Sequence, residues 1–232
     1  MSLPYFFELN ITATNQFTLS EETSKHCVQV LRMKTGEALH ITDGNGNLYK
    51  ATIYNADKKH CTVTIQEHHF TPKNNREITV AISLLKNANR FEWFLEKATE
   101  LGISAIIPLI SKRTEKQHFR QDRMQQIVIA AMLQSRQVWL PKLHTPTPIN
   151  QHIQQSNAAI KLIAHCEECE KKSIQEIAPQ SSIEILIGPE GDFTNEEIAF
   201  ASSNTYQSVT LGNTRLRTET AGVVAATLLV HL

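Results

Sequence analysis

The pattern of apolar residues changes once along the chain, near Glu77, and this change constrains the fold more than any other feature. Before it, short runs of β-branched and aromatic residues alternate with polar ones, as in half-exposed strands. After it, continuous apolar runs alternate with helix-like segments, which predicts buried strands in a mostly parallel sheet covered by helices on both faces. Because 232 residues can fold as a small domain beside a medium one, we expect an α/β protein with domains over residues 1–70 and 76–232.

The N-terminal domain is expected to be a small β-barrel-like structure with one helix. Asp43-Gly44-Asn45-Gly46 predicts a hairpin, since Gly and Asn tolerate the positive φ of a tight turn. Ser20 is a suitable N-cap for a helix that extends to Leu31. His68–Arg76 is interpreted as the linker. The expected strands are Phe6–Ile11, Ala38–Thr42, Leu48–Tyr54 and Cys61–Glu67.

The C-terminal domain is expected to alternate strands with helices. The expected buried strands are Ile78–Leu85, Ala105–Ile110, Ile160–Ala164, Ile183–Ile187 and Ser208–Leu211. The expected helices are Arg90–Leu101, Phe119–Arg136, Ile174–Ala178, Asn195–Ser203 and Thr220–Leu232, and Pro141–Pro148 is expected to be an extended connection.

Two loops follow predicted strands at the edge where open parallel sheets bind ligands. The first is Gly188-Pro189-Glu190-Gly191-Asp192, whose glycines allow a ligand to approach the backbone closely. Thr194 and Glu197 then have the spacing of a capping box. A plain strand–turn–helix connection is the alternative for this loop alone.

The second loop is Gly212–Ala221, where Arg217 and Glu219 lie beside a helix start with Thr218 or Thr220 as the N-cap. Charged side chains at the mouth of an apolar helix are costly to bury unless they are paired or bound. A surface pair of Arg217 with Glu219 is the alternative. Neither GxGxxG nor GxxxxGK[ST] occurs, which excludes the ordinary dinucleotide and P-loop sites.

The net charge is zero, but basic residues concentrate in the middle of the chain. Residues 76–140 contain ten Lys or Arg against six Asp or Glu, whereas residues 183–232 contain two against six. Local clustering of this kind suits a polyanion, although a solvated helix face would give the same pattern. The cluster consists of Lys112, Arg113, Lys116, Arg120, Arg123 and Arg136.

The four cysteines do not form a disulfide framework, which fits a reducing compartment. Only Cys166 and Cys169 have ligand-like spacing, and a structural zinc site needs four ligands, so we expect no metal. Met1–Asn10 lacks the features of a signal peptide, and Ala221–Val230 is too short to cross a bilayer. We therefore expect a cytoplasmic protein that does not enter a membrane.

GPEGD at 188–192 and LGNTRLRTETA at 211–221 resemble the C-terminal motifs of the 16S rRNA uracil-N3 methyltransferases of the RsmE type, in the SPOUT superfamily. The resemblance continues through Glu96–Gly102, Pro108, Arg113, Gln134–Arg136 and Pro141, and through His26, Val30–Arg32 and Asp43-Gly44. It therefore covers nearly the whole chain. The family usually has a glycine or similar small residue in place of Asp192 and an acidic residue in place of Leu133.

The resemblance implies a PUA-like RNA-binding β-barrel followed by a SPOUT domain with a deep trefoil knot. It also implies a homodimer, a bound S-adenosylmethionine at the dimer interface, and 16S rRNA of the small ribosomal subunit as the partner. The residues that it implies for cofactor binding are Ile187, Gly188, Pro189, Glu190, Gly191, Leu211, Gly212, Leu216, Thr220 and Ala221.

Uracil N3 carries a proton, so a methyltransferase must remove it or stabilise the resulting anion. We expect Arg217 or Arg136 to stabilise negative charge on the base and give this role more weight than proton removal by Glu219. RNA phosphates would be bound by Arg32 and by five residues of the basic middle segment, Lys112, Arg113, Lys116, Arg120 and Arg123.

Two alternatives stay open at this point. The chain could be a knotted methyltransferase that acts on tRNA or on a ribose hydroxyl, or a ribosome-assembly protein that binds RNA without catalysis. The intact GPEG and LRTETA motifs argue against a loss of catalysis.

Overall fold

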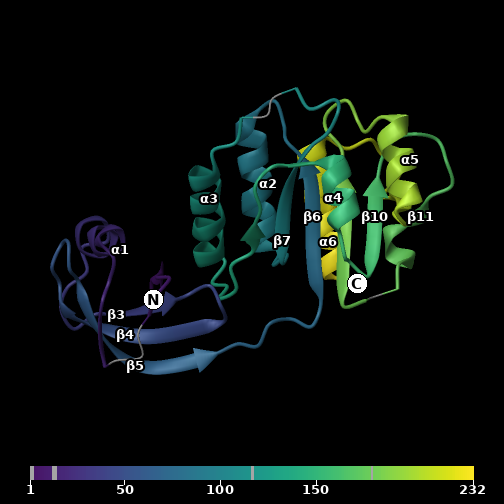
Figure 1. The fold of residues 1–232 in the computed structure, drawn as a ribbon. Coiled ribbons are helices and arrows are strands. Elements are labelled where there is room, and N and C mark those ends of the chain that lie inside the picture. The colour runs from purple at the N-terminus through teal and green to yellow at the C-terminus, as the bar shows by residue number, and fades with distance from the viewer. Residues whose placement is uncertain (1–2, 12–14, 116–117, 179) are drawn as a thin grey trace. The chain divides into compact units, whose positions relative to one another are not determined.

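The computed structural model of the protein describes residues 3–11, 15–115, 118–178 and 180–232 (Figure 1). Contacts divide the chain into two compact units. The first consists of Met1–Lys73 with Met132–Leu140, and the second of Asn74–Ala131 with Pro141–Leu232. The segment Met132–Leu140 therefore packs with the first unit, although its place in the sequence put it within the expected second domain.

The first unit is built on a five-stranded sheet. Its order is β1 (Tyr5–Phe7), β3 (Ala38–Thr42), β4 (Asn47–Asn55), β5 (Thr62–Phe70) and β2 (Gln16–Thr18). β1 runs parallel to β3, and the other pairs are antiparallel. The hairpin predicted from Asp43–Gly46 joins β3 to β4, with φ of 72° at Gly44 and 91° at Gly46.

The helical segment of this unit begins where the sequence indicated. The Ser20 hydroxyl accepts a hydrogen bond from the Thr23 amide and caps α1 (Glu21–Lys25). A π-helical turn, η1 (His26–Val30), continues it. The prediction of the linker was wrong at its start, because β5 extends to Phe70 instead of ending at Glu67.

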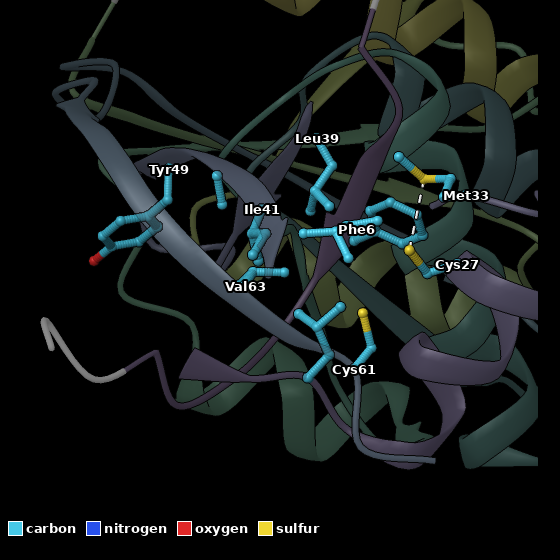
Figure 2. Packing of buried hydrophobic residues seen from close by; sticks show 11 residues of the cluster. Phe6, Cys27, Met33, Leu39, Ile41, Tyr49, Cys61 and Val63 are labelled. Atoms are coloured by element: carbon cyan, nitrogen blue, oxygen red, sulfur yellow. Dashed lines mark hydrogen bonds between the residues drawn. The ribbon is translucent and has the colours of Figure 1, made fainter. Parts of the chain in front are cut away.

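Alternate residues of the strands form the apolar core of the first unit (Figure 2). Leu39 and Ile41 of β3 are fully buried, and Val63 of β5 packs in the same cluster. Cys27 and Cys61 are also fully buried, and the hydrogen bond with the Cys61 thiol, together with burial, raises the pKa of Cys27. These two cysteines are core residues.

Trp139 attaches the segment Met132–Leu140 to the sheet of this unit. Its indole nitrogen donates to the Thr71 carbonyl at 2.9 Å. A Cβ on Gly46 would lie 2.6 Å from the Trp139 ring, so the hairpin needs glycine there for space as well as for its positive φ. The tryptophan thus packs on the tip of the hairpin.

The second unit contains an eight-stranded sheet. Its main path is β11 (Lys172–Ser173), β13 (Gln207–Thr210), β10 (Ile160–Ala164), β12 (Ser182–Ile187), β6 (Glu77–Ser83), β7 (Ala105–Ile110) and β8 (Lys142–Leu143), and β9 (Thr147–Pro148) pairs with β7. Every pairing among the described strands of this second sheet is parallel. This confirms the α/β class predicted from the continuous apolar runs.

Helices cover both faces of this sheet (Figure 1). α4 (Ile149–Gln155) and α5 (Asn195–Ser203) pack on the face that carries Ala81, and share its core with Phe193. α2 (Ala88–Glu100) and α6 (Thr218–Val230) contact one another, and Ile82 points toward α6. Neighbouring residues of β6 therefore serve opposite layers, as the alternation of strand side chains requires.

The structure differs from three expectations for this unit. The helix predicted over Ile174–Ala178 is only a short 3-10 turn, Ile174–Glu176. Thr218 and Thr220 do not cap α6, because the N-cap position is Arg217 and no side chain bonds there. α3 (Gln121–Gln134) begins two residues later than expected. The trefoil knot implied by the resemblance stays a prediction.

Candidate functional site

Three segments follow the carboxyl ends of neighbouring strands β10, β12 and β13 in the second unit. Ala164, at the end of β10, pairs with Ile187 on one side and with Val209 on the other. The segments enclose a cavity of about 750 Å³, a volume in the range of small-molecule sites. The site thus lies at the sheet edge that the sequence indicated.

The first wall is the loop after β12. Gly188 and Pro189 line the cavity, and a Cβ on Gly188 would lie 3.1 Å from an Asp192 carboxylate oxygen. The capping box predicted after this loop is present: Thr194 Oγ1 accepts from the Glu197 amide, and Glu197 Oε2 accepts from the Thr194 amide. It fixes where the loop ends and α5 begins.

The second wall is the loop after β13, which continues into α6. Gly212 has φ of 140°, a conformation that L side chains rarely adopt. Arg217 is exposed and lines the cavity, and its carbonyl accepts from the Ala221 amide at 2.7 Å. The side chain of the N-cap residue Arg217 makes no capping hydrogen bond, so it leaves the first amides of α6 available to another group.

Eight of the ten cofactor-binding candidates line this cavity. Gly191 and Thr220 are not among the lining residues, although each belongs to a loop or helix that forms the wall. The eight are Ile187, Gly188, Pro189, Glu190, Leu211, Gly212, Leu216 and Ala221.

The third wall is the segment after β10, which the sequence reasoning missed. His165, Cys166 and Lys171 line the cavity. The His165 ring bonds through Nε2 to the Ser208 hydroxyl at 2.9 Å, and its buried Nδ1 has no hydrogen-bond partner among the described residues. Burial, with a smaller effect of the Lys171 charge, lowers the pKa of His165. The only signal in the sequence was the cluster of His165, Cys166 and Cys169, which suggested a metal instead.

The described residues hold no group of three or more His, Cys, Asp or Glu side chains that could bind a metal ion. Likewise, no helix in the described ranges is long and apolar enough to cross a bilayer.

Glu219 does not line the cavity, although it is close to one residue that does. It is only 7% exposed, and its Oε1 lies 3.6 Å from Nε of Arg90 on α2. Its Oε2 is buried and has no hydrogen-bond partner in the part of the chain that the structure describes. Arg90 lines the cavity and was not among the predicted residues, because it is far from Glu219 in the sequence.

Arg136 and Arg32 belong to the first unit, whereas the cavity lies in the second. Both have a positive φ, 56° at Arg136 and 55° at Arg32. Such values are uncommon for residues other than glycine.

The basic residues proposed to bind RNA differ in what they contact. Lys112 forms an ion pair with Glu196 at 2.7 Å, and Arg123 binds the Glu92 carboxylate through two nitrogens. Arg120 is exposed. Lys116 lies outside the described residues.

Arg113, also assigned to RNA, contacts the first wall of the cavity. Its Nη1 donates to the Gly191 carbonyl at 2.6 Å and to the Phe193 carbonyl at 3.4 Å. Its aliphatic stem would lie 3.3 Å from a Cβ on Gly191. The guanidinium therefore holds the backbone of the loop after β12, and this contact does not require RNA.

Comparison with known proteins agrees with this geometry. Residues 72–230 match the RNA methyltransferase domain family, and residues 19–66 match the RNA methyltransferase PUA domain. The chain belongs to the RNA methyltransferase family. The ribosomal RNA small subunit methyltransferase E of Mesomycoplasma hyopneumoniae is 30% identical over 96% of this chain and 97% of its own. The enzyme of that name from Rickettsia conorii is 29% identical over 95% and 91%.

A solved structure shows the same fold with a ligand. The ribosomal RNA small subunit methyltransferase E of Neisseria gonorrhoeae, bound to S-adenosyl methionine, has a TM-score of 0.88 and 29% identity. The match covers 97% of this chain and 95% of that chain. The first unit is thus PUA-like, and the second has the α/β fold of this methyltransferase family.

Proposed function

We propose that the protein transfers a methyl group from S-adenosylmethionine to N3 of a uridine in the 16S rRNA of the small ribosomal subunit. The observation that carries this proposal is the cavity at the ends of β10, β12 and β13, lined by both sequence motifs. The names of the relatives, all small-subunit rRNA methyltransferases, support the choice of substrate over tRNA. A ribosomal substrate also supports a cytoplasmic location.

The cavity has features that suit the methyl donor. Gly188 and Gly212 expose backbone along two walls, and Ile187, which is 2% exposed, supplies an apolar surface. The buried Nδ1 of His165 and the uncapped start of α6 offer polar atoms in need of a partner. These groups fit a ligand with an adenine, a ribose and an amino-acid end.

When bound there, the donor supplies a methyl group on a sulfonium. The protein must hold that group in line with the base nitrogen, which depends on the rigidity of the three walls. It must also exclude competing water and stabilise charge on the base.

Arg217 is suited to the stabilisation of charge, because it is exposed and lines the cavity. A guanidinium beside the uracil oxygens would favour the deprotonated base. Glu219 is less suited to accept the N3 proton, since its side chain is buried against Arg90 and does not line the cavity. We assign to Glu219 the positioning of Arg90, and we retain Arg136 as a second candidate for contact with the base.

We further propose that the active form is a homodimer that uses the outer side of α6. Apolar residues occur on every side of this helix, although its buried residues occupy only one side. A helix that is apolar all round is normally buried. The partly exposed residues of this helix include Val223, Val224, Thr227 and Leu228.

RNA would approach the exposed basic residues of both units. Arg120 is exposed, whereas Arg113 is held by its contacts with the loop after β12. Lys112 forms an exposed ion pair with Glu196, and such a pair contributes little to stability and can be exchanged for a phosphate contact. Arg123, paired in two-point geometry, and Lys116 remain candidates.

Calorimetric titration with S-adenosylmethionine, followed by methyl transfer to small ribosomal subunits, tests the proposal. The Arg217→Ala variant should bind the donor nearly as well as the wild type but lose most of its turnover, with an intact fold. Lys142→Ala, an exposed residue of β8 outside the cavity, is the matched control and should retain full turnover. Near-normal turnover of Arg217→Ala would refute the role given to this arginine.

A further inference from the structure

Asp192 has a backbone conformation that favours glycine, with φ of 64°. Asp is one of the few other residues found there, but the conformation alone does not require a carboxylate. The Asp192 amide donates to the Pro189 carbonyl at 2.9 Å, which closes the turn through the backbone alone. The side chain must therefore be explained by its own contacts.

Both carboxylate oxygens of Asp192 accept backbone hydrogen bonds. Oδ1 accepts from the Phe193 amide at 2.8 Å, within the same loop. Oδ2 accepts from the Cys166 amide at 2.7 Å, in the segment after β10. Bonds from amides to a carboxylate are stronger than neutral ones. One side chain thus ties the first wall of the cavity to the third.

The third wall has two more attachments. Nε2 of His165 bonds to Ser208 of β13, and the Lys171 ammonium donates to the His165 carbonyl at 2.8 Å. The segment is therefore joined to β13 by His165 and closed on itself by Lys171. Among the described residues, its one side-chain hydrogen bond to the loop after β12 is the bond from the Cys166 amide to Asp192. Without that bond, the described parts of the segments after β10 and β12 would be held together only by the pairing of the two strands up to Ala164 and Ile187.

We propose that Asp192 is a positioning residue of the methyl-donor site, and that it fastens the segment after β10, at the Cys166 amide, to the Gly188–Gly191 loop. The proposal rests on the function proposed above. Asp192 acts through the two segments that it joins. If its bonds are lost, the donor must order the segment after β10 when it binds, and this ordering lowers affinity. Replacement of Asp192 should therefore weaken donor binding more than it lowers kcat or rRNA binding.

The test compares Asp192→Gly, Asp192→Asn and a matched control, Asp57→Gly. Glycine keeps the φ of 64° without strain and removes both bonds. Asparagine also tolerates this conformation but keeps only one acceptor oxygen. Asp57 lies in the other unit, where its Oδ1 accepts from the Lys59 and His60 amides, so its replacement also removes two backbone bonds.

The measurements are the Kd of S-adenosylmethionine by calorimetry, KM for donor and for rRNA, kcat, and hydrogen exchange of the Cys166 amide. For Asp192→Gly we expect Kd and donor KM to rise on the order of tenfold. We expect KM for rRNA to stay within about twofold, and the Cys166 amide to exchange faster. Asp192→Asn should lie between Asp192→Gly and the wild type, and Asp57→Gly should match the wild type.

An unchanged Kd in Asp192→Gly, or an equal loss in Asp57→Gly, would overturn the proposal. If Asp192→Gly fails to fold, Asp192→Asn decides through the same measurements. Absence of donor binding by the folded wild-type protein would instead reject the proposed function, and this inference with it.

Discussion

Arg113 could act in either of two ways: it could bind an RNA phosphate, or it could stabilise the loop after β12 that lines the cavity. Its charge and position in the sequence suggested a contact with RNA phosphate, whereas its Nη1 donates to the Gly191 carbonyl at 2.6 Å. We predict that Arg113→Ala weakens binding of the methyl donor and leaves the salt dependence of RNA binding nearly unchanged.

The magnitude follows from the bond that is lost. A hydrogen bond to a charged group contributes about 1.5–3 kcal/mol when sheltered, and Arg113 is exposed, so we take about 1–1.5 kcal/mol. If the donor must then order the loop, this corresponds to a rise in Kd of up to about tenfold. A phosphate contact would instead contribute about 0.7–0.9 to the slope of log K against log salt.

The assay is a pair of titrations on the same variants, one with S-adenosylmethionine and one with an rRNA fragment at several salt concentrations. Arg113→Lys keeps the charge but loses the planar fork, so it should bind RNA normally and the donor weakly. Lys112→Ala, which alters a neighbouring exposed cation, should leave donor affinity unchanged. An unchanged donor Kd in Arg113→Ala, together with a reduced salt slope, would refute the reasoning.

Two further predictions concern stability. Gly222→Ala should gain about 1 kcal/mol of helix propensity but lose about 1–3 kcal/mol to overpacking, because the new Cβ would lie 2.6 Å from Phe94 Cε2. Urea unfolding should show a net loss of stability, and the loss should be smaller in a Phe94→Leu background. A stabilised Gly222→Ala variant would contradict this packing. For Glu184, burial raises the pKa, but the hydrogen bond and charge of His152 outweigh it and leave the pKa below 4.5. A lowered folded-state pKa gives stability that is present above 4.5 and lost as the pH falls through the folded value, so Glu184→Gln should flatten the acid limb of stability against pH.

Much of the fold was predictable where local sequence decides the structure. Ala105–Ile110, Ile160–Ala164 and Asn195–Ser203 have the predicted bounds, because continuous apolar runs and a capping box mark them unambiguously. α4 was missed, since Ile149–Gln155 contains few apolar positions and lies directly after a short strand. The two-residue strands β8 and β9 are too short to give a pattern.

The features that depend on long-range contacts could not be predicted. Nothing in the sequence places β10 beside both β12 and β13, and only that order brings His165 and Lys171 to the cavity. The pairing of Arg90 with Glu219 likewise depends on contact between α2 and α6. The side chain of Asp192, which the family resemblance marked as a departure, accepts a local bond from the Phe193 amide and a long-range bond from the Cys166 amide. No pattern in the sequence indicated the long-range bond.

The central claim is that the protein methylates uridine N3 in 16S rRNA. The most direct test is mass mapping of small-subunit rRNA from cells that lack the protein, beside cells that express the wild type or Arg217→Ala. We predict that one N3-methyluridine disappears, returns with the wild-type protein and does not return with the variant. Persistence of that modified base in cells without the protein would contradict the account.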